Sequence, residues 1–136
     1  TGNNKMKKKI LIVASSYYND LTNNLVSSAQ RKLKKKNIIF KVIKVPGTFE
    51  IPILISKNIK KYHAFIALGC VIKGETPHFD FICSSTFNAL MNISVSFKKP
   101  VGNGIITCLN MNQARKRSKT KGNEAVDAVL EILNYD

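Results

Sequence analysis

The residues of this chain that are best suited to chemistry gather in one short segment, Gly74-Glu75-Thr76-Pro77-His78. Thr followed by Pro is typical of a helix start, with Thr76 as the N-cap and Pro77 at the first helical position. The unpaired N–H groups and positive dipole end of a helix N-terminus bind anions such as phosphate. His78 would lie in the first helical turn, where the dipole favours a neutral imidazole that can accept or pass a proton. The segment therefore predicts an anion site beside a candidate general acid or base.

The other reactive side chains do not single out one reaction. A lone histidine is often a capping or packing residue, and His63, at the start of an expected strand, is interpreted as structural. Cys83 and Cys108 fit core positions, and no cysteine lies in a recognisable nucleophile elbow. The three cysteines form neither a CxxC pair nor a cluster with histidine, so we expect no disulfide framework and no metal site. P-loop and dinucleotide-binding glycine patterns are absent from the sequence.

Short apolar runs alternate with helical periodicity along the chain, and together they place the candidate segment in a fold. Continuous apolar runs are typical of strands that are covered on both faces, as in a parallel sheet. We expect strands at 10–14, 38–45, 64–72 and 100–108, and helices from 19 or 20 to about 33 and at 49–60, 76–97, 110–117 and 123–134. Asn19 or Asp20 could cap the first of these helices, and Pro52 is tolerated only in the first turn of the second. Phe79 and Ile82 begin the apolar face of the third. This order predicts an α/β fold: a three-layer α/β/α sandwich with a four-stranded parallel sheet, flavodoxin-like in type. Ligands of such folds bind outside the carboxyl ends of the strands.

Length and charge limit the domain organisation and the partners. A chain of 136 residues suits one core, which we expect at 10–136, after a basic N-terminal segment at 1–9. No apolar run approaches the roughly 18 residues that a membrane span needs. The formal net charge is +14, which would suit a polyanion such as RNA. No aromatic residues interleave with the lysine runs, so we interpret them as a solvated surface and expect no nucleic-acid partner.

Four segments at the expected strand ends form an ordered set that covers the chain from about residue 10 to 133. They are VPGTFEIP at 45–52, ALGCVIKGETPHFDF at 67–81, GNGIIT at 102–107 and KGNEA at 121–125. This set resembles VPGAFEIP, ALGxVIRGETPHFDY, GNGxLT and KGxEA of the lumazine synthase family, and Tyr18-Asn19 stands where that family has Phe-Asn. The resemblance implies a transferase of riboflavin biosynthesis that uses no cofactor. It would condense 5-amino-6-(D-ribitylamino)uracil with 3,4-dihydroxy-2-butanone 4-phosphate to 6,7-dimethyl-8-ribityllumazine, releasing phosphate and water.

The resemblance also implies roles for individual residues. His78 would relay protons during the condensation. The ribitylaminouracil would contact one set of residues, with Asn103 offered by a neighbouring subunit: Tyr18, Thr48, Phe49, Glu50, Cys70, Val71, Ile72 and Asn103. The butanone phosphate would be held by a second set, with Arg117 from the neighbour and Lys121 as an additional charge: Glu75, Thr76, Arg117 and Lys121.

The sequence departs from the family pattern at three places. Tyr17-Tyr18 stands where many members have Arg-Phe, and Asn103 occupies a position that is Phe in others. The connection between Arg117 and Lys121 is shorter than the longer form found in the family. The shortening leaves open whether Arg117 or Arg115 holds the phosphate.

Sites shared between subunits imply a homo-oligomer, and we expect a homopentamer. Whether pentamers assemble further into a hollow shell of sixty subunits stays open. The cysteine usage and the polar, basic opening residues lead us to expect a cytoplasmic protein. Two other functions remain as alternatives: a catalytically silent family member that binds ligands or forms cages, and a basic module that binds polyanions in a salt-dependent way.

Overall fold

A four-stranded parallel sheet forms the centre of the computed structural model, which describes residues 8–135. Its strands are β1 (Lys9–Ser15), β2 (Ile39–Val45), β3 (Ala64–Ile72) and β4 (Val101–Cys108). They lie in the order β2-β1-β3-β4, and every neighbouring pair is parallel. This is the strand order of the flavodoxin-like folds, so the predicted fold class is confirmed.

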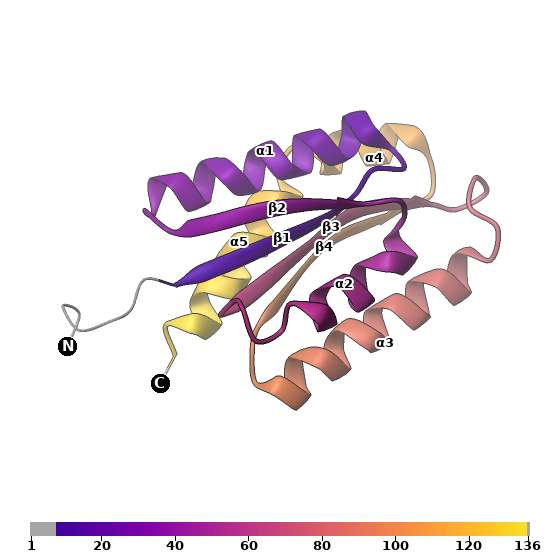
Figure 1. The fold of residues 1–136 in the computed structure, drawn as a ribbon. Coiled ribbons are helices and arrows are strands. Elements are labelled where there is room, and N and C mark those ends of the chain that lie inside the picture. Colours follow the sequence, from indigo (N-terminus) through magenta and orange to yellow (C-terminus); the bar gives the residue numbers. More distant parts are fainter. Residues whose placement is uncertain (1–7, 136) are drawn as a thin grey trace.

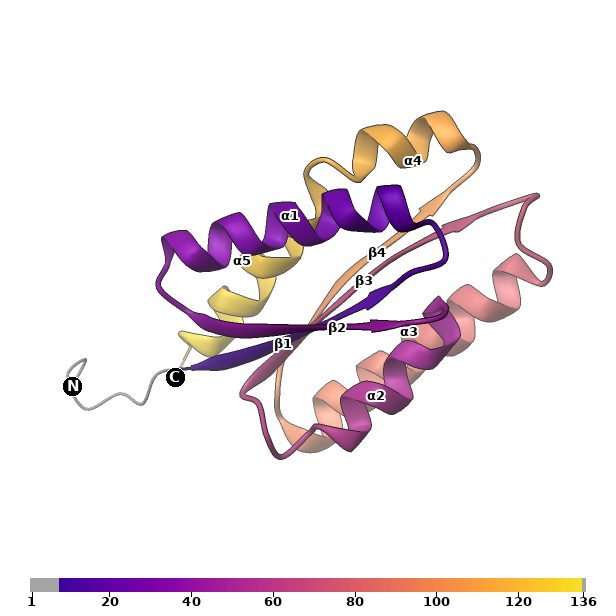
Figure 2. The same cartoon turned by 45° about the horizontal axis from the view of Figure 1, so that its top comes forward.

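Helices cover both faces of the sheet (Figures 1 and 2). One face carries α1 (Asn19–Lys35), α4 (Met111–Arg117) and α5 (Lys121–Leu133), and the other carries α2 (Ile51–Lys57) and the long α3 (Phe79–Phe97). A short 3-10 helix, η2 (Thr48–Glu50), leads directly into α2. None of the described helices is long and apolar enough to cross a membrane.

The two central strands are buried on both faces, as their continuous apolar runs predict. Every residue of β3 is buried, and its side chains alternate between the core under α1 and α5 and the core under α2 and α3. At about 25 cal/mol per Å² of apolar surface, this two-sided burial is the main force that holds β1 and β3 at the centre. The carboxyl ends of β1 and β3 are therefore fixed side by side.

Most element boundaries agree with the sequence prediction within one or two residues, but the start of α1 does not follow the predicted capping. Neither Asn19 nor Asp20 caps the helix; the N-cap is Tyr18, and it makes no side-chain capping hydrogen bond. The Asn19 amide oxygen instead accepts a hydrogen bond from Lys44 Nζ at 3.4 Å. The same ammonium donates to Asn23 at 2.9 Å, so a β2 side chain engages the first turns of α1.

The prediction that Thr76 caps α3 and Pro77 opens it is wrong. The helix begins at Phe79, and its N-cap is His78. The backbone N–H groups of Glu75 and Thr76 both donate to Ile72 O, at 3.2 and 3.0 Å, so the chain turns tightly before the helix starts. Gly74 makes this turn with a φ of +89°, a conformation that side chains strongly disfavour.

The last helix begins earlier than predicted, at Lys121 instead of residue 123. Gly122 lies inside its first turn because α5 crosses α1 closely there: a Cβ at this position would lie 2.1 Å from Leu25 O. The predicted helix at 49–60 is divided into η2 and α2, with Pro52 in the first turn of α2 as expected. The division of the chain at residue 9 stays a prediction, and residues 1–7 lie outside the described residues.

Candidate active site

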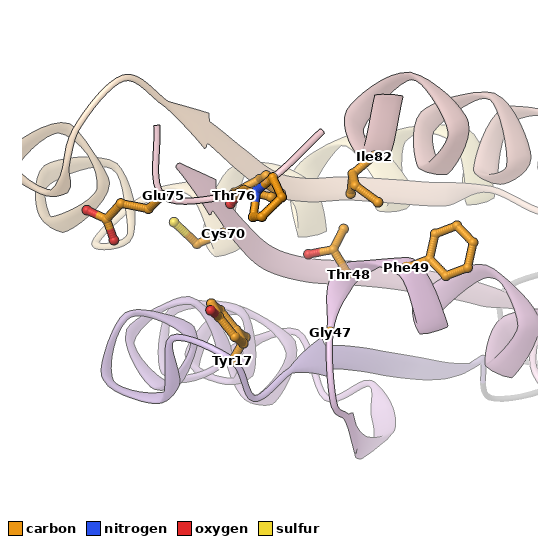
Figure 3. Close-up of a pocket in the computed structure, with 10 residues that line it drawn as sticks. Tyr17, Gly47, Thr48, Phe49, Cys70, Glu75, Thr76 and Ile82 are labelled. Carbon is orange, nitrogen blue, oxygen red and sulfur yellow. The ribbon is translucent and has the colours of Figure 1, made fainter. Parts of the chain in front are cut away.

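A pocket of about 270 Å³ opens at the carboxyl ends of β1, β2 and β3 (Figure 3). It lies where the strand order reverses between β1 and β3, the usual ligand position in such sheets. Ten residues from four successive segments line it: Tyr17, Gly47, Thr48, Phe49, Cys70, Val71, Glu75, Thr76, Pro77 and Ile82. Six of the predicted site residues are among them, and the pocket is mainly apolar with a few polar groups, which suits a flat ring with polar edges.

The floor of the pocket is formed by the end of β3 and the loop after β2. Thr48 is buried against Gly69, where a Cβ would lie 3.1 Å from Thr48 Oγ1 and 3.3 Å from Ser15 Cβ. A larger residue at position 69 would therefore crowd the Thr48 and Ser15 side chains. The loop is closed by Glu50 Oε1, which accepts a hydrogen bond from Gly47 N at 2.9 Å. This bond occupies one carboxylate oxygen of Glu50. Glu50 itself follows Phe49 and is not one of the residues that line the pocket.

The cysteine in the pocket is not set up as a nucleophile. Burial raises the pKa of Cys70 to about 12, with the nearby Cys108 and Glu75 adding to the rise. Burial likewise raises the pKa of Cys108, opposed by the positive charge of Arg117. Because the thiolate is the reactive form, a thiol that stays neutral at physiological pH acts as a small apolar wall. Cys70 therefore shapes the pocket next to Val71.

The loop between β3 and α3 brings polar groups to the rim. Thr76 lines the pocket, and Glu75 does so with its carboxylate pointing away from the side where Thr48 and Ile82 lie (Figure 3). His78 is exposed and adopts a left-handed backbone conformation, with φ 57° and ψ 39°. Such a conformation is uncommon for a residue other than glycine and clusters at functional sites. No side chain caps α3, so the N–H groups of its first turn are free to meet an anion.

Two tyrosines follow β1, and they take different positions. Tyr17 is exposed and lines the pocket, whereas Tyr18 is half-buried and packs against the core beneath α1. Their rings meet edge to face, with centroids 4.9 Å apart. Tyr18 Oη donates a hydrogen bond to Glu75 Oε1 at 3.0 Å. The sequence analysis assigns Tyr18 to the pyrimidine and notes Tyr17 only as a departure from the family pattern. In the structure, Tyr17 is the one of the two that lines the pocket.

Three of the predicted residues lie away from this pocket. Arg117 and Lys121 line a second, more polar pocket between β4, α4 and α5. Arg117 Nη1 donates to Thr107 O at 2.8 Å, which fixes the guanidinium beside the edge strand. Asn103 is exposed on the same strand. Among the described residues, the two pockets share no lining residue.

Two further candidate residues, Ile72 and Arg115, do not line the first pocket. Ile72 is fully buried in the core and does not line the pocket. Arg115 lines a separate hollow between α1 and α4 together with Tyr18 and Met111. Within residues 8–135, no three histidine, cysteine, aspartate or glutamate side chains come together as metal ligands.

Sequence reasoning missed four residues that line the pocket: Tyr17, Gly47, Pro77 and Ile82. Pro77 and Gly47 lie inside the quoted motifs, and their neighbours were assigned instead. Ile82 lies one turn inside α3, and its helical spacing from Phe79 predicts a side chain that faces the core instead of a pocket. The signal for Tyr17 was its place directly after the end of β1, where ligand-binding loops of this fold type begin.

Comparison with known proteins agrees with this geometry. The family model described as 6,7-dimethyl-8-ribityllumazine synthase matches residues 7–136. The chain belongs to this family. It is 40% identical over 112 residues to the 6,7-dimethyl-8-ribityllumazine synthase of Corynebacterium kroppenstedtii, which covers 78% of this chain and 70% of that protein. It is 43% identical over 95 residues to the synthase of the same name from Nitratidesulfovibrio vulgaris, which covers 68% of this chain and 61% of that protein.

A solved structure of the lactose-specific IIB component domain of a phosphotransferase system from Streptococcus pneumoniae is also similar in outline. Its sequence identity is 9% and its TM-score 0.46, over 93% of this chain and 97% of that one. The family assignment confirms the prediction made from the sequence motifs: the protein is a lumazine synthase of riboflavin biosynthesis, a transferase.

Proposed function

We propose that the pocket at the carboxyl ends of β1–β3 is the place where 5-amino-6-(D-ribitylamino)uracil meets 3,4-dihydroxy-2-butanone 4-phosphate to form 6,7-dimethyl-8-ribityllumazine. The observation that carries this proposal is that Thr48, Phe49, Cys70, Val71, Glu75 and Thr76, which come from two separate sequence motifs, line one pocket. The two substrates are held at the same strand ends, where proximity alone removes much of the entropic barrier to a bimolecular condensation.

The uracil substrate fits the apolar part of the pocket. Val71 and the neutral Cys70 thiol offer one wall for the ring, and Tyr17, which meets Tyr18 edge to face, offers an aromatic face on the other side. Phe49 is exposed at the rim, so it gains a partner only when ligand or another subunit covers it. The ribityl hydroxyls pair with Thr48 and with the free oxygen of Glu50.

The phosphate of the second substrate is assigned to the uncapped first turn of α3, next to Thr76. There the backbone N–H groups and the helix dipole favour negative charge. His78 stands at this helix end and takes part in the proton transfers as the amine adds to the ketone, water leaves and the phosphate departs. Its exposed position suits a residue that exchanges protons with solvent between steps.

Arg117 and Lys121 complete the phosphate site from a neighbouring subunit. They lie in the second pocket, which is separate from the first within one chain. The guanidinium is held by Thr107 O and has further N–H groups that can bind a phosphate in a charge-assisted fork. The active site is therefore shared between subunits, with Asn103 on the same edge strand closing it.

A homopentamer is the assembly we propose. Large apolar side chains are exposed on the α2–α3 face and at the pocket rim, where a second copy of the chain would cover them: Phe49, Ile53, Phe81, Met91, Val95 and Phe97. Isolated soluble domains rarely leave so many apolar residues in contact with water on one side. Localisation in the cytoplasm, as expected for a biosynthetic enzyme with three free cysteines, belongs to the same proposal.

The activity is tested by mixing the purified protein with both substrates and following the lumazine by absorbance and fluorescence above the uncatalysed background. Saturable acceleration supports the proposal. A folded, assembled protein that gives no acceleration contradicts it, and salt-dependent binding to nucleic acid would then favour the polyanion-binding alternative. Light scattering on the same sample should give five times the chain mass of 15.2 kDa, or sixty times if a shell forms.

A further inference from the structure

One hydrogen bond joins two loops of the pocket rim that lie 57 residues apart in the sequence. Tyr18 Oη donates to Glu75 Oε1 at 3.0 Å, linking the N-cap of α1 to the loop after β3. The Tyr18 ring is held from two sides, by the core beneath α1 and by the edge-to-face contact with Tyr17. These ring contacts therefore fix the position of the Tyr18 hydroxyl relative to Glu75.

Glu75, in contrast, is exposed and has few other constraints. In residues 8–135, no lysine, arginine or histidine forms an ion pair with it. The Tyr18 hydroxyl is the hydrogen-bond donor to its carboxylate in this part of the chain. With that bond in place, the carboxylate points away from the side of the pocket where Thr48 and Ile82 lie (Figure 3).

The family resemblance implies that Glu75 helps to hold the butanone phosphate, but its carboxylate carries charge of the same sign as the phosphate. The position of Glu75 in the sequence therefore makes its side chain a competitor for the phosphate site. It precedes His78, the N-cap of α3, by three residues, and no side chain caps this helix. Carboxylates are attracted to uncapped helix N-termini, where they accept hydrogen bonds from the free N–H groups. A Glu75 side chain released from Tyr18 would be drawn to the same N–H groups that the phosphate needs.

We propose that Tyr18 is a positioning residue whose hydroxyl holds the Glu75 carboxylate on the α1 side of the pocket and so keeps the N-terminus of α3 open for the substrate phosphate. This proposal rests on the proposed function, because it assigns the phosphate to that helix end. It gives the tyrosine hydroxyl a role that a phenylalanine ring at the same position could not fill.

The hydrogen bond itself is tested without any substrate. The buried ring and the Glu75 carboxylate raise the pKa of Tyr18 to about 12. In Glu75→Gln the carboxylate is gone, so the pKa of Tyr18 should fall toward its ordinary value of 10, measured by NMR of ring-labelled tyrosine. Tyr135, exposed near the chain end, serves as the reference tyrosine and should titrate alike in both proteins. An unchanged Tyr18 titration would overturn the proposal.

The positioning role is tested with Tyr18→Phe, Glu75→Gln and the double variant, each as the assembled enzyme. Releasing the carboxylate in Tyr18→Phe should raise the KM for butanone phosphate roughly 2- to 10-fold, the range of a charge at a helix end. Because the ring is retained, the rise should fall more on the KM for butanone phosphate than on the KM for the ribitylaminouracil. In the double variant the competing charge is absent, so the KM for butanone phosphate should return to that of Glu75→Gln.

The double variant separates positioning from a merely structural loss. If the KM stays high after Glu75→Gln is added to Tyr18→Phe, or if Tyr18→Phe changes only the affinity for the uracil, the proposal is overturned. Binding of inorganic phosphate, measured by calorimetry, should follow the same order in these variants. If the wild-type enzyme shows no condensation at all while the Tyr18 titration responds to Glu75→Gln, the proposed function fails and the hydrogen bond stands.

Discussion

Replacing Arg117 by alanine should weaken the binding of butanone phosphate and leave the other steps largely intact. The guanidinium lies at the surface with Nη1 donating to Thr107 O at 2.8 Å, and it has further N–H groups that can pair with a phosphate. Hydrogen bonds to charged groups contribute about 1.5–3 kcal/mol each, and about 1.4 kcal/mol corresponds to a factor of ten. Loss of one such interaction therefore predicts a KM for butanone phosphate that is roughly 10- to 150-fold higher.

The assay is steady-state lumazine formation, with each substrate varied in turn. The KM for the ribitylaminouracil should change by less than about twofold, because Arg117 holds the other substrate. Arg117→Lys should recover part of the loss, since it restores the charge without the planar fork. Arg115→Ala is the matched control: Arg115 is two residues away but lines a different hollow, beside Tyr18 and Met111.

Two results would refute this reasoning. A KM for butanone phosphate that stays at the wild-type value in an assembled Arg117→Ala protein would remove Arg117 from the phosphate site. A large rise in Arg115→Ala instead would mean that the shortened connection moves the phosphate-binding role to Arg115. In both cases light scattering on the variant must show the wild-type mass, so that a defect in assembly is not read as a defect in binding.

Three further predictions follow from particular residues. His78→Ala should lower kcat about 10- to 100-fold without abolishing turnover, because proximity of the substrates remains; complete inactivity in a rapid-mixing assay would contradict this. Burial, with Lys8 and Lys99 nearby, lowers the pKa of His63. Its Nδ1 also accepts a hydrogen bond from Lys9 N at 2.9 Å. Because the unfolded chain then binds the proton more readily, the free energy of unfolding should decline as the pH falls below about 6.5, and less so in His63→Gln; equal declines would refute it. Gly122→Ala, which places a Cβ 2.1 Å from Leu25 O, should cost about 1–3 kcal/mol in urea unfolding, and an unchanged midpoint would show that α5 can move.

The sheet could be predicted from the sequence because its signals are local and strong. The strand at 64–72 is apolar throughout, and it matches β3 residue for residue. A strand that is apolar at every position is stable only where both of its faces are buried, as at the centre of a parallel sheet. The motifs at the ends of these strands likewise predicted six residues that line the pocket, since parallel strands bring their carboxyl ends to one edge.

The errors arise where a local turn or a contact with a distant strand overrides the capping preference of a residue type. Thr76 and Pro77 have the right types for a helix start, yet Ile72 O takes two N–H groups and delays the helix to Phe79. Asn19 is a good capping residue, but its side chain pairs with Lys44 from β2. Residue types alone do not reveal the tight turn at Ile72, and Lys44 comes from a strand 25 residues further along the chain than Asn19.

The division of the predicted phosphate site between two pockets could not be predicted from local sequence patterns either. Arg117 and Thr76 belong to one predicted phosphate site, but they line different surfaces of the chain. Under the proposed function a neighbouring subunit brings them together, so the proposed site depends on the subunit arrangement. A sequence motif names such residues without indicating which copy supplies them.

The most direct test of this account is complementation between two impaired subunits. His78→Ala and Arg117→Ala chains are unfolded, mixed in equal amounts and refolded together, and lumazine formation is measured at low butanone phosphate. If neighbours share each site, random mixing restores about a quarter of the sites to wild-type composition, and activity rises well above the average of the two separate variants. If activity equals that average in mixed assemblies verified by mass spectrometry, each site lies within one chain and the account is contradicted.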